Sequence, residues 1–507
     1  MTADAIARQV TAAMSIDVGE FDERVAEEAS SLKSQLREGV FDNPQAIVGL
    51  EYEFYAVVDG TARLTRMPRP LLRLIGFEKE LGLHNAEMQT SPQPLNAPGL
   101  RTQLSEVQSR LGAAERRVRA DDIRLVSDGM WVVPPPGEGA LDYLVDHVRT
   151  DGVVVATNVS DAVRYHAFGN AHLELGRRID LPGATVETTT VGPASLTQTI
   201  QPHLQVPQAI DLPEYFRYAL RIAGPILSLG VNSPFLPPEL YDSPPEEVLE
   251  RGYRENRIPV FEGTMNPVKA PDKVRFPRDI DTVETAVDRI AADPTIVPAD
   301  LEVVDPDGQF AFHETFPHFR HKHGSYWRWV RPVFDGRSRS AANARIEFRP
   351  LPAQPTVPDT VAFQALFGGA LVALQAVEHP VANMSWEQAK ENFYAGARDG
   401  LEADLHWITA DGEETTTPDV LFDELFGYAR EGLRSRGVPD GEIDAHLAPL
   451  RDRFDRGITP AEWKRTQVKE RIDEGAGFTE AVYATQEEYV DRQRDTLFKG
   501  RFTDWLE

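Results

Sequence analysis

Two short segments with alternating apolar and charged residues constrain the fold of this chain most. Residues 48–54 place Glu51 and Glu53 on one face of an extended chain, and residues 344–349 place Arg345, Glu347 and Arg349 on one face in the same way. A period of two predicts a β-strand with one buried and one polar face. Same-face neighbours lie roughly 6.6 Å apart, and ionised carboxylates held that close repel each other unless positive charge lies between them. The two strands therefore predict a site for metal ions and phosphate.

Charge excludes some classes of partner. The chain has 53 basic and 80 acidic residues and a formal net charge of −27, which argues against binding to nucleic acid or to anionic membranes. The basic residues are 9 Lys and 44 Arg, and the acidic residues are spread along the chain rather than gathered in a tail. This composition is typical of proteins from extreme halophiles. Most surface carboxylates then carry no information about mechanism.

The absence of cysteine excludes disulfides, thiolate metal sites and a cysteine nucleophile. The N-terminus has no basic region followed by an apolar core, so no signal peptide is visible, and we expect a cytoplasmic protein. The most apolar stretch, Val361–Val377, contains two glutamines and two glycines and is bounded by acidic residues. It predicts a buried core helix rather than a membrane span.

The order of the expected elements predicts an α+β protein with a mainly antiparallel sheet, because strands and helices follow one another without regular βαβ alternation. Residues 1–40 predict an acidic helical extension, and residues 100–118 carry apolar residues at helical spacing. Residues 41–400 form the expected main domain. Residues 401–507 predict a helical C-terminal region packed on that same domain.

Three further segments contain residues that suit a metal site, although each alone has an ordinary structural explanation. Glu87 precedes a turn, His203 lies on a half-apolar strand, and Asn232 begins a polar turn after an apolar helix. A lone histidine of this kind is more often a structural residue, and a lone loop glutamate is more often solvated.

Taken in order, these segments resemble the glutamate–cysteine ligase family of the carboxylate–amine ligase type, which has a glutamine-synthetase-like fold. The matching segments cover roughly residues 45–400 and are Gly49–Phe54, Glu87 before Thr90-Ser91-Pro92, His203-Leu204-Gln205, Asn232–Phe235, Tyr326–Pro332, Glu347–Arg349, and Asn392 with Ala397–Leu401. The resemblance implies an active site on the concave face of the sheet. It also implies ATP and two or three Mg²⁺ ions as cofactors, with small molecules as substrates: glutamate or a similar carboxylate, and an amine.

Roles for individual residues also follow from the resemblance. The metal ligands would be Glu51, Glu53, Glu87, His203 and Glu347. Carboxylate oxygens suit Mg²⁺, a hard ion that keeps positions open for phosphate. A guanidinium binds carboxylate or phosphate through two hydrogen bonds, so Arg349 and Arg331 would hold the substrate carboxylate or the transferring phosphoryl group.

The chain departs from the family pattern at the histidine strand, where H-x-H appears as His203-Leu204-Gln205. His172-Leu173-Glu174 is a competing metal-compatible segment, but the distance from His203 to the Asn232 turn fits the family better. A second early acidic ligand is open; Glu80 is one candidate that no local pattern identifies.

We therefore expect an ATP-dependent ligase that forms a γ-glutamyl amide through an acyl phosphate, with glutamate–cysteine ligase as the leading assignment. A ligase for another acid and amine, or a non-catalytic binding protein that keeps the fold, is the alternative. The sequence leaves room for a homo-oligomer. A basic island with His313, His318, His321 and His323 has irregular spacing, which favours an exposed loop over an ATP or phosphate contact.

Overall fold

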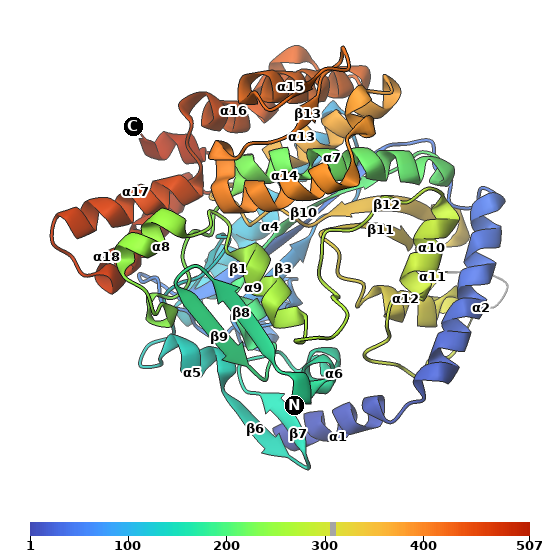
Figure 1. Cartoon of the computed structure of the whole chain (residues 1–507). Helices are drawn as coiled ribbons and strands as arrows, with labels where there is room; N and C mark the ends of the chain where they lie inside the picture. Colours follow the sequence, from blue (N-terminus) through green and yellow to red (C-terminus); the bar gives the residue numbers. More distant parts are fainter. Residues whose placement is uncertain (305–310, 507) are drawn as a thin grey trace.

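A computed structural model describes residues 1–304 and 311–506, and its centre is an antiparallel sheet (Figure 1). The strand order is β11-β12-β10-β1-β3-β2, and β4 and β5 also pair with β1. The long strand β1 (Ile47–Val58) contains the first charged segment, and β12 (Asn343–Phe348) contains most of the second. The remaining strands of this sheet are β2 (Glu78–Lys79), β3 (Asn85–Gln89), β4 (Gln93–Pro94), β5 (Ile123–Val126), β10 (Ile200–Gln205) and β11 (Val330–Asp335).

The apolar face of the sheet is covered by three long helices, α4 (Ala97–Val118), α7 (Leu212–Gly230) and α13 (Val357–Ala376). Leu50, Tyr52 and Phe54 of β1 belong to this buried core. Helix α13 is long and apolar enough to cross a membrane, but 94% of its most apolar window is buried inside the protein, as predicted for a core helix. Gly369 and Gly432 let α13 approach α15 (Pro418–Ser435) closely, because a methyl group at Gly432 would overlap the carbonyl oxygen of Gly369.

Helices and small hairpins surround the sheet. At one edge, α2 (Val18–Arg37) lies along α10 (Val283–Ala291) and α12 (Pro317–His323), and the C-terminal helices lie on the opposite side (Figure 1). Helix α1 (Ala3–Met14) packs against α6 (Val163–Asn170) and β7 (Val153–Ala156). The C-terminal helices after α15 are α16 (Asp440–Arg456), α17 (Pro460–Asp473) and α18 (Phe478–Thr496). The division into domains after residues 40 and 400 stays a prediction.

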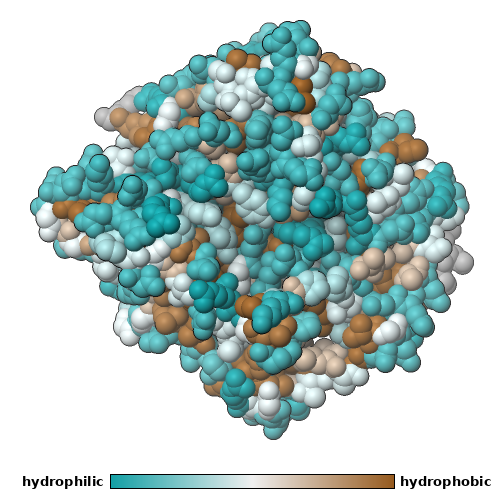
Figure 2. All heavy atoms as spheres, viewed as in Figure 1, coloured by the Kyte–Doolittle hydropathy of each residue, from teal (hydrophilic) through white to brown (hydrophobic). Residues whose placement is uncertain are grey.

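The other elements frame the open face of the sheet or lie at its ends. The helices are α3 (Arg69–Leu74), α5 (Ala140–Val145), α6 (Val163–Asn170), α8 (Pro245–Arg251), α9 (Arg257–Met265), α11 (Phe312–Thr315) and α14 (Trp386–Asp399). The hairpins are β6 (His147–Thr150) with β7 (Val153–Ala156), β8 (Arg177–Leu181) with β9 (Ala184–Thr188), and β13 (Trp407–Ile408) with β14 (Glu414–Thr415). Figure 2 shows one face of the molecule, which is largely hydrophilic and carries hydrophobic residues in several separate groups.

Candidate active site

The strand register brings four of the predicted residues into one row across the sheet. Gly49 of β1 is opposite His203 of β10, His203 is opposite Glu347 of β12, and Glu347 is opposite Arg331 of β11. Residues directly opposite each other in antiparallel strands point to the same face, with Cβ atoms about 5 Å apart. Gly49 has no side chain, so the imidazole and the two charged groups share the space above it.

A second row contains only carboxylates. Glu53 of β1 is opposite Glu87 of β3, and Glu87 is opposite Glu78 of β2. Glu51 lies two residues before Glu53 on the same face, which is the face turned away from the helices of the core. The face predicted from the period-two pattern is therefore the one that carries the charges.

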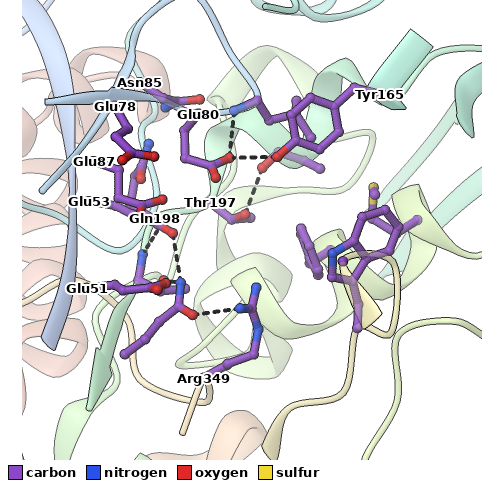
Figure 3. A pocket seen from close by; sticks show the side chains of 18 of the residues that line it. Glu51, Glu53, Glu78, Glu80, Asn85, Glu87, Tyr165, Thr197, Gln198 and Arg349 are labelled. Atoms are coloured by element: carbon purple, nitrogen blue, oxygen red, sulfur yellow. Dashed lines mark hydrogen bonds between the residues drawn. The ribbon is translucent and has the colours of Figure 1, made fainter. Parts of the chain in front are cut away.

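The side chains form two groups that could each hold a metal ion. In the first group, one ligand atom each from Glu51, His203 and Glu347 lies within 4.8 Å of the others, and the same is true of Glu53, Glu80 and Glu87 in the second group. Figure 3 shows Glu53, Glu80 and Glu87 pointing into one cavity. The structure thus brings all five predicted ligands together and places Glu80, the candidate for the second early acidic ligand, in the second group.

Arg349 connects the two groups through Gln201. The Arg349 guanidinium donates a hydrogen bond to Gln201 Oε1 at 2.6 Å and also pairs with Glu347. The Gln201 amide donates to Glu53 Oε1 at 3.0 Å, and the backbone N–H of Thr199 donates to Glu53 Oε2 at 2.6 Å. The second predicted arginine, Arg331, donates from Nε to Glu347 Oε2 at 2.9 Å.

Burial and mutual repulsion keep the proton on several of these carboxyls. Burial, assisted by Glu347, raises the pKa of Glu51 to about 7, and burial, assisted by Glu80, raises the pKa of Glu53 to about 8. Burial and the neighbouring glutamates also raise the pKa of Glu87 well above its usual value. Burial acts in the same direction on Glu347, but its two arginine partners outweigh it, so the pKa of Glu347 is lowered well below its ordinary value.

His203 is placed for metal binding, but one hydrogen bond opposes that role. Its Nε2 atom lies 3.6 Å from Glu51 Oε1 and is a buried atom with no hydrogen-bond partner among the described residues. Its Nδ1 atom accepts a hydrogen bond of 3.2 Å from Arg345 Nε, which leaves the ring proton of the neutral imidazole on Nε2. Burial lowers the pKa of His203 to about 3, so the ring is neutral. A metal ion on Nε2 would therefore require the contact with Arg345 to break.

The competing histidine lies elsewhere. His172 is exposed in a left-handed turn with φ of 58°, before a short 3₁₀ helix, and it takes no part in either group of ligands. Glu174 is also exposed. The structure therefore favours His203 over His172 for the strand that the family pattern requires.

The two groups of ligands lie in a cleft with two adjoining cavities of about 340 and 370 Å³. The first is lined by the acidic residues and also by the apolar side chains of Phe261, Met265, Trp327 and Trp329. The second is lined by fewer carboxylates and by two histidines, His321 and His323. Glu51 and Arg331 line both cavities and so lie where they meet.

The expectation of an exposed loop for the basic island is wrong. The island forms the short helices α11 and α12, in which His318 is buried and His321 and His323 line the second cavity; only His313 is exposed. These helices are too short to be read from local spacing, and tertiary contacts with α2 hold α12 in place.

Several cleft residues were missed from the sequence. Gln201 could have been found, because it lies two residues before His203 and must share its strand face. Thr199, Arg164 and Tyr165 come from a loop and a helix whose position relative to the sheet has no local signal. Glu80, just after the edge strand β2, has the same difficulty.

The donor set fits Mg²⁺. Each group offers carboxylate oxygens, which are the ligands that this ion prefers. In the second group every ligand is a carboxylate, and in the first group Nε2 of His203 would add a borderline ligand once Arg345 released Nδ1. Clustered carboxylates of this kind are stabilised when cations offset their repulsion.

Comparisons with known proteins identify the family of the chain. Residues 47–488 match the family model for glutamate-cysteine ligase family 2. No curated protein sequence matches the chain at a significant level.

Among solved structures, the glutamate–cysteine ligase from Francisella tularensis in complex with AMP has a TM-score of 0.50 and 14% sequence identity, covering 90% of this chain and 91% of that chain. A bifunctional glutathione synthetase from Pasteurella multocida has a TM-score of 0.49 and 12% identity, covering 92% of this chain and 55% of that chain. The ligase of the prokaryotic ubiquitin-like protein Pup, in complex with Pup, has a TM-score of 0.37 and 12% identity, covering 87% and 71%. The first likeness confirms the predicted fold class, α+β with a curled, mainly antiparallel sheet.

Proposed function

Because this chain belongs to glutamate-cysteine ligase family 2, a family of carboxylate–amine ligases, we propose that it forms a γ-glutamyl amide from glutamate and an amine with consumption of ATP. Cysteine is the leading amine. The observation that carries the proposal is that the two groups of metal-compatible residues lie on one face of the sheet and are joined through Arg349 and Gln201. This arrangement supplies both the ligands for metal ions and a cation for the group being transferred.

Joining a carboxylate to an amine in water is uphill, so the carboxylate is first converted to an acyl phosphate, and the amine then displaces phosphate. Phosphoryl transfer depends mainly on positioning and on neutralisation of charge. Mg²⁺ ions held by the first and second groups of ligands would supply that neutralisation and orient the phosphates. The similar Francisella enzyme binds AMP, which supports a nucleotide in this cleft.

The arginines act on the anions. Arg349 pairs with Glu347 and is linked to Glu53 through Gln201, so its guanidinium lies between the two ligand groups and is available to the γ-carboxylate as it becomes an acyl phosphate. Arg331 lines both cavities and pairs with Glu347, which places a second cation beside the same centre. In the same cavity, Trp327 and Trp329 form an apolar wall that limits the access of water to the acyl phosphate.

The setting of the reaction is also a proposal. The composition supports a cytoplasm rich in KCl, and the substrates are small molecules rather than nucleic acid or membrane lipid. A homo-oligomer stays an expectation.

A non-catalytic binding protein with this fold is the second candidate. The hydrogen bond from Arg345 to His203 favours it, because that contact withdraws one of the predicted ligands from a metal ion. Retention of Glu51, Glu53 and Glu347 favours the ligase, since a binding protein gains nothing from carboxylates that repel one another.

The test is a turnover assay with the whole chain in concentrated KCl, Mg²⁺ and ATP. Glutamate is offered with a panel of amines that includes cysteine, and ADP release is measured against ATP alone, with mass spectrometry of the product. We expect release with at least one amine and a product heavier than glutamate by the amine minus water. No release above the background with any pairing would refute the ligase. A Glu347→Ala variant with full activity would refute the assignment of the metal ligands.

A further inference from the structure

Helix α2 holds the beginning of α12 through one buried carboxylate. Glu28 Oε1 lies 2.6 Å from His318 Nδ1 and accepts the backbone N–H of His318 at 3.3 Å, and Glu28 Oε2 accepts the N–H of Phe319 at 2.8 Å. Glu28 is 8% exposed and His318 1%. The first backbone N–H groups of a helix have no partner within it. A side chain from another element therefore supplies the cap that α12 lacks in its own sequence.

Two more side chains of α2 contact α12. Asp22 Oδ1 accepts a hydrogen bond of 2.6 Å from the ammonium of Lys322, near the other end of α12. The Phe21 ring packs against His318 and His321, with ring centroids 5.8 Å apart in both pairs. A helix of seven residues is not stable by itself, so the position of α12 depends on these contacts.

The end of α12 in turn positions a predicted active-site arginine. Arg331 Nη1 donates hydrogen bonds of 3.3 Å to the backbone oxygens of His323, the last residue of α12, and Tyr326. Its Nε donates to Glu347 Oε2 at 2.9 Å. The orientation of the guanidinium is thus fixed on one side by Glu347 and on the other by backbone oxygens at the end of α12 and just after it.

We infer that α2 is a positioning element of the active site and that Glu28 is its central residue, acting through α12 on Arg331. Helix α2 lies outside residues 47–488, which match the family model, so the family pattern does not account for it. The inference rests on the proposed function only in that Arg331 is taken to bind the phosphates of ATP. It assigns to the N-terminal extension a part in substrate binding rather than in stability alone.

The test compares Glu28→Gln with Glu27→Gln, an exposed neighbour on the same helix. ATP with Mg²⁺ is titrated into each full-length protein, and binding is followed by tryptophan fluorescence, because Trp327 lines both cavities. We expect the Kd for ATP to rise about tenfold in Glu28→Gln, the size of effect that follows from losing one buried charge-assisted contact, and to stay unchanged in Glu27→Gln. Asp22→Asn is expected to shift the Kd in the same direction and serves as the test if Glu28→Gln does not fold.

A double-mutant cycle separates positioning from simple destabilisation. If Glu28 acts through Arg331, Glu28→Gln has no further effect on ATP binding in an Arg331→Lys background. Equal losses in both backgrounds would overturn the inference, as would a Glu28→Gln variant that binds ATP like the wild type. If the wild type itself binds no ATP, the proposed function is wrong and the inference falls with it. Failure of the proposed function therefore shows in the wild type, whereas failure of the inference shows only in the Glu28→Gln variants.

Discussion

Mg²⁺ binding should release protons near neutral pH, because buried carboxyls must ionise to become ligands. Burial raises the pKa of Glu51 to about 7 and of Glu53 to about 8. At pH 7 Glu53 is roughly nine-tenths protonated, so its ionisation when Mg²⁺ enters the second group releases about 0.9 proton; at pH 9 the same calculation gives about 0.1. Glu51 belongs to the first group, so its roughly one-half proton at pH 7 is released only when that group fills. Burial raises the pKa of Glu87 well above its usual value as well, and this group adds up to about one proton.

Isothermal titration calorimetry measures this release directly. MgCl₂ is titrated into the protein at constant KCl in two buffers with different ionisation enthalpies, first at pH 7 and then at pH 9. The dependence of the observed enthalpy on the buffer gives the number of protons. The matched variant Glu53→Gln should release about 0.9 proton fewer than the wild type at pH 7 and almost the same number at pH 9. A release below half a proton at pH 7, or one that does not fall between pH 7 and 9, would refute the reasoning.

Three further outcomes are expected. Without Mg²⁺, the unfolding midpoint measured by calorimetry should fall as pH rises from 5.5 to 8.5, and the fall should be smaller in Glu53→Gln. A carboxyl whose pKa is raised in the folded state stabilises that state only while it is protonated. For Glu53 this stability is lost as pH rises through the folded-state pKa of about 8. Arg349→Lys should lower kcat/KM at least about 100-fold, since a lysine lacks the planar fork that binds an anion through two hydrogen bonds, while an unchanged value would remove Arg349 from the site. His203→Ala should raise the Mg²⁺ concentration needed for half-maximal activity about tenfold, whereas His172→Ala should leave it unchanged; the reverse result would show that the wrong histidine was aligned.

The local pattern was sufficient to predict both charged strands. Alternation is a property of neighbouring residues, and it assigned Glu51, Glu53 and Glu347 to the polar faces of their strands before any pairing was known. It could not show that β10 lies between β1 and β12, because strand order depends on contacts between distant parts of the chain. The order of motifs in the resembling family supplied only the expectation that these residues share one concave face of the sheet.

What the sequence did not reveal follows from the same limit. Glu80 lies beyond the end of an edge strand, where no alternation fixes its direction, and its approach to Glu53 and Glu87 results from the turn that follows. Helix α12 is held by Glu28, almost three hundred residues earlier in the chain. Such contacts are formed by tertiary packing, and neither partner has a local pattern that names the other.

The sheet neutralises its clustered carboxylates in two ways, and the difference predicts the order in which metal ions bind. Glu347 is balanced by Arg331 and Arg349, so a metal ion in the first group competes with two cations. Among the described residues, no arginine is ion-paired with Glu53 or Glu87, whose charge is instead suppressed by protonation. The second group should therefore bind the first metal ion.

The first group should fill only with ATP, because the phosphates then take over the pairing with the two arginines. Titration with Mn²⁺, followed by electron paramagnetic resonance, should show one tightly bound ion for each chain without nucleotide and at least one more with a non-hydrolysable ATP analogue. Glu53→Gln should weaken the binding of the first ion, and Glu347→Gln should affect only the ions that need nucleotide. If Glu347→Gln removes the nucleotide-independent ion while Glu53→Gln retains it, the order is the reverse, and the arginines do not control access to the first group.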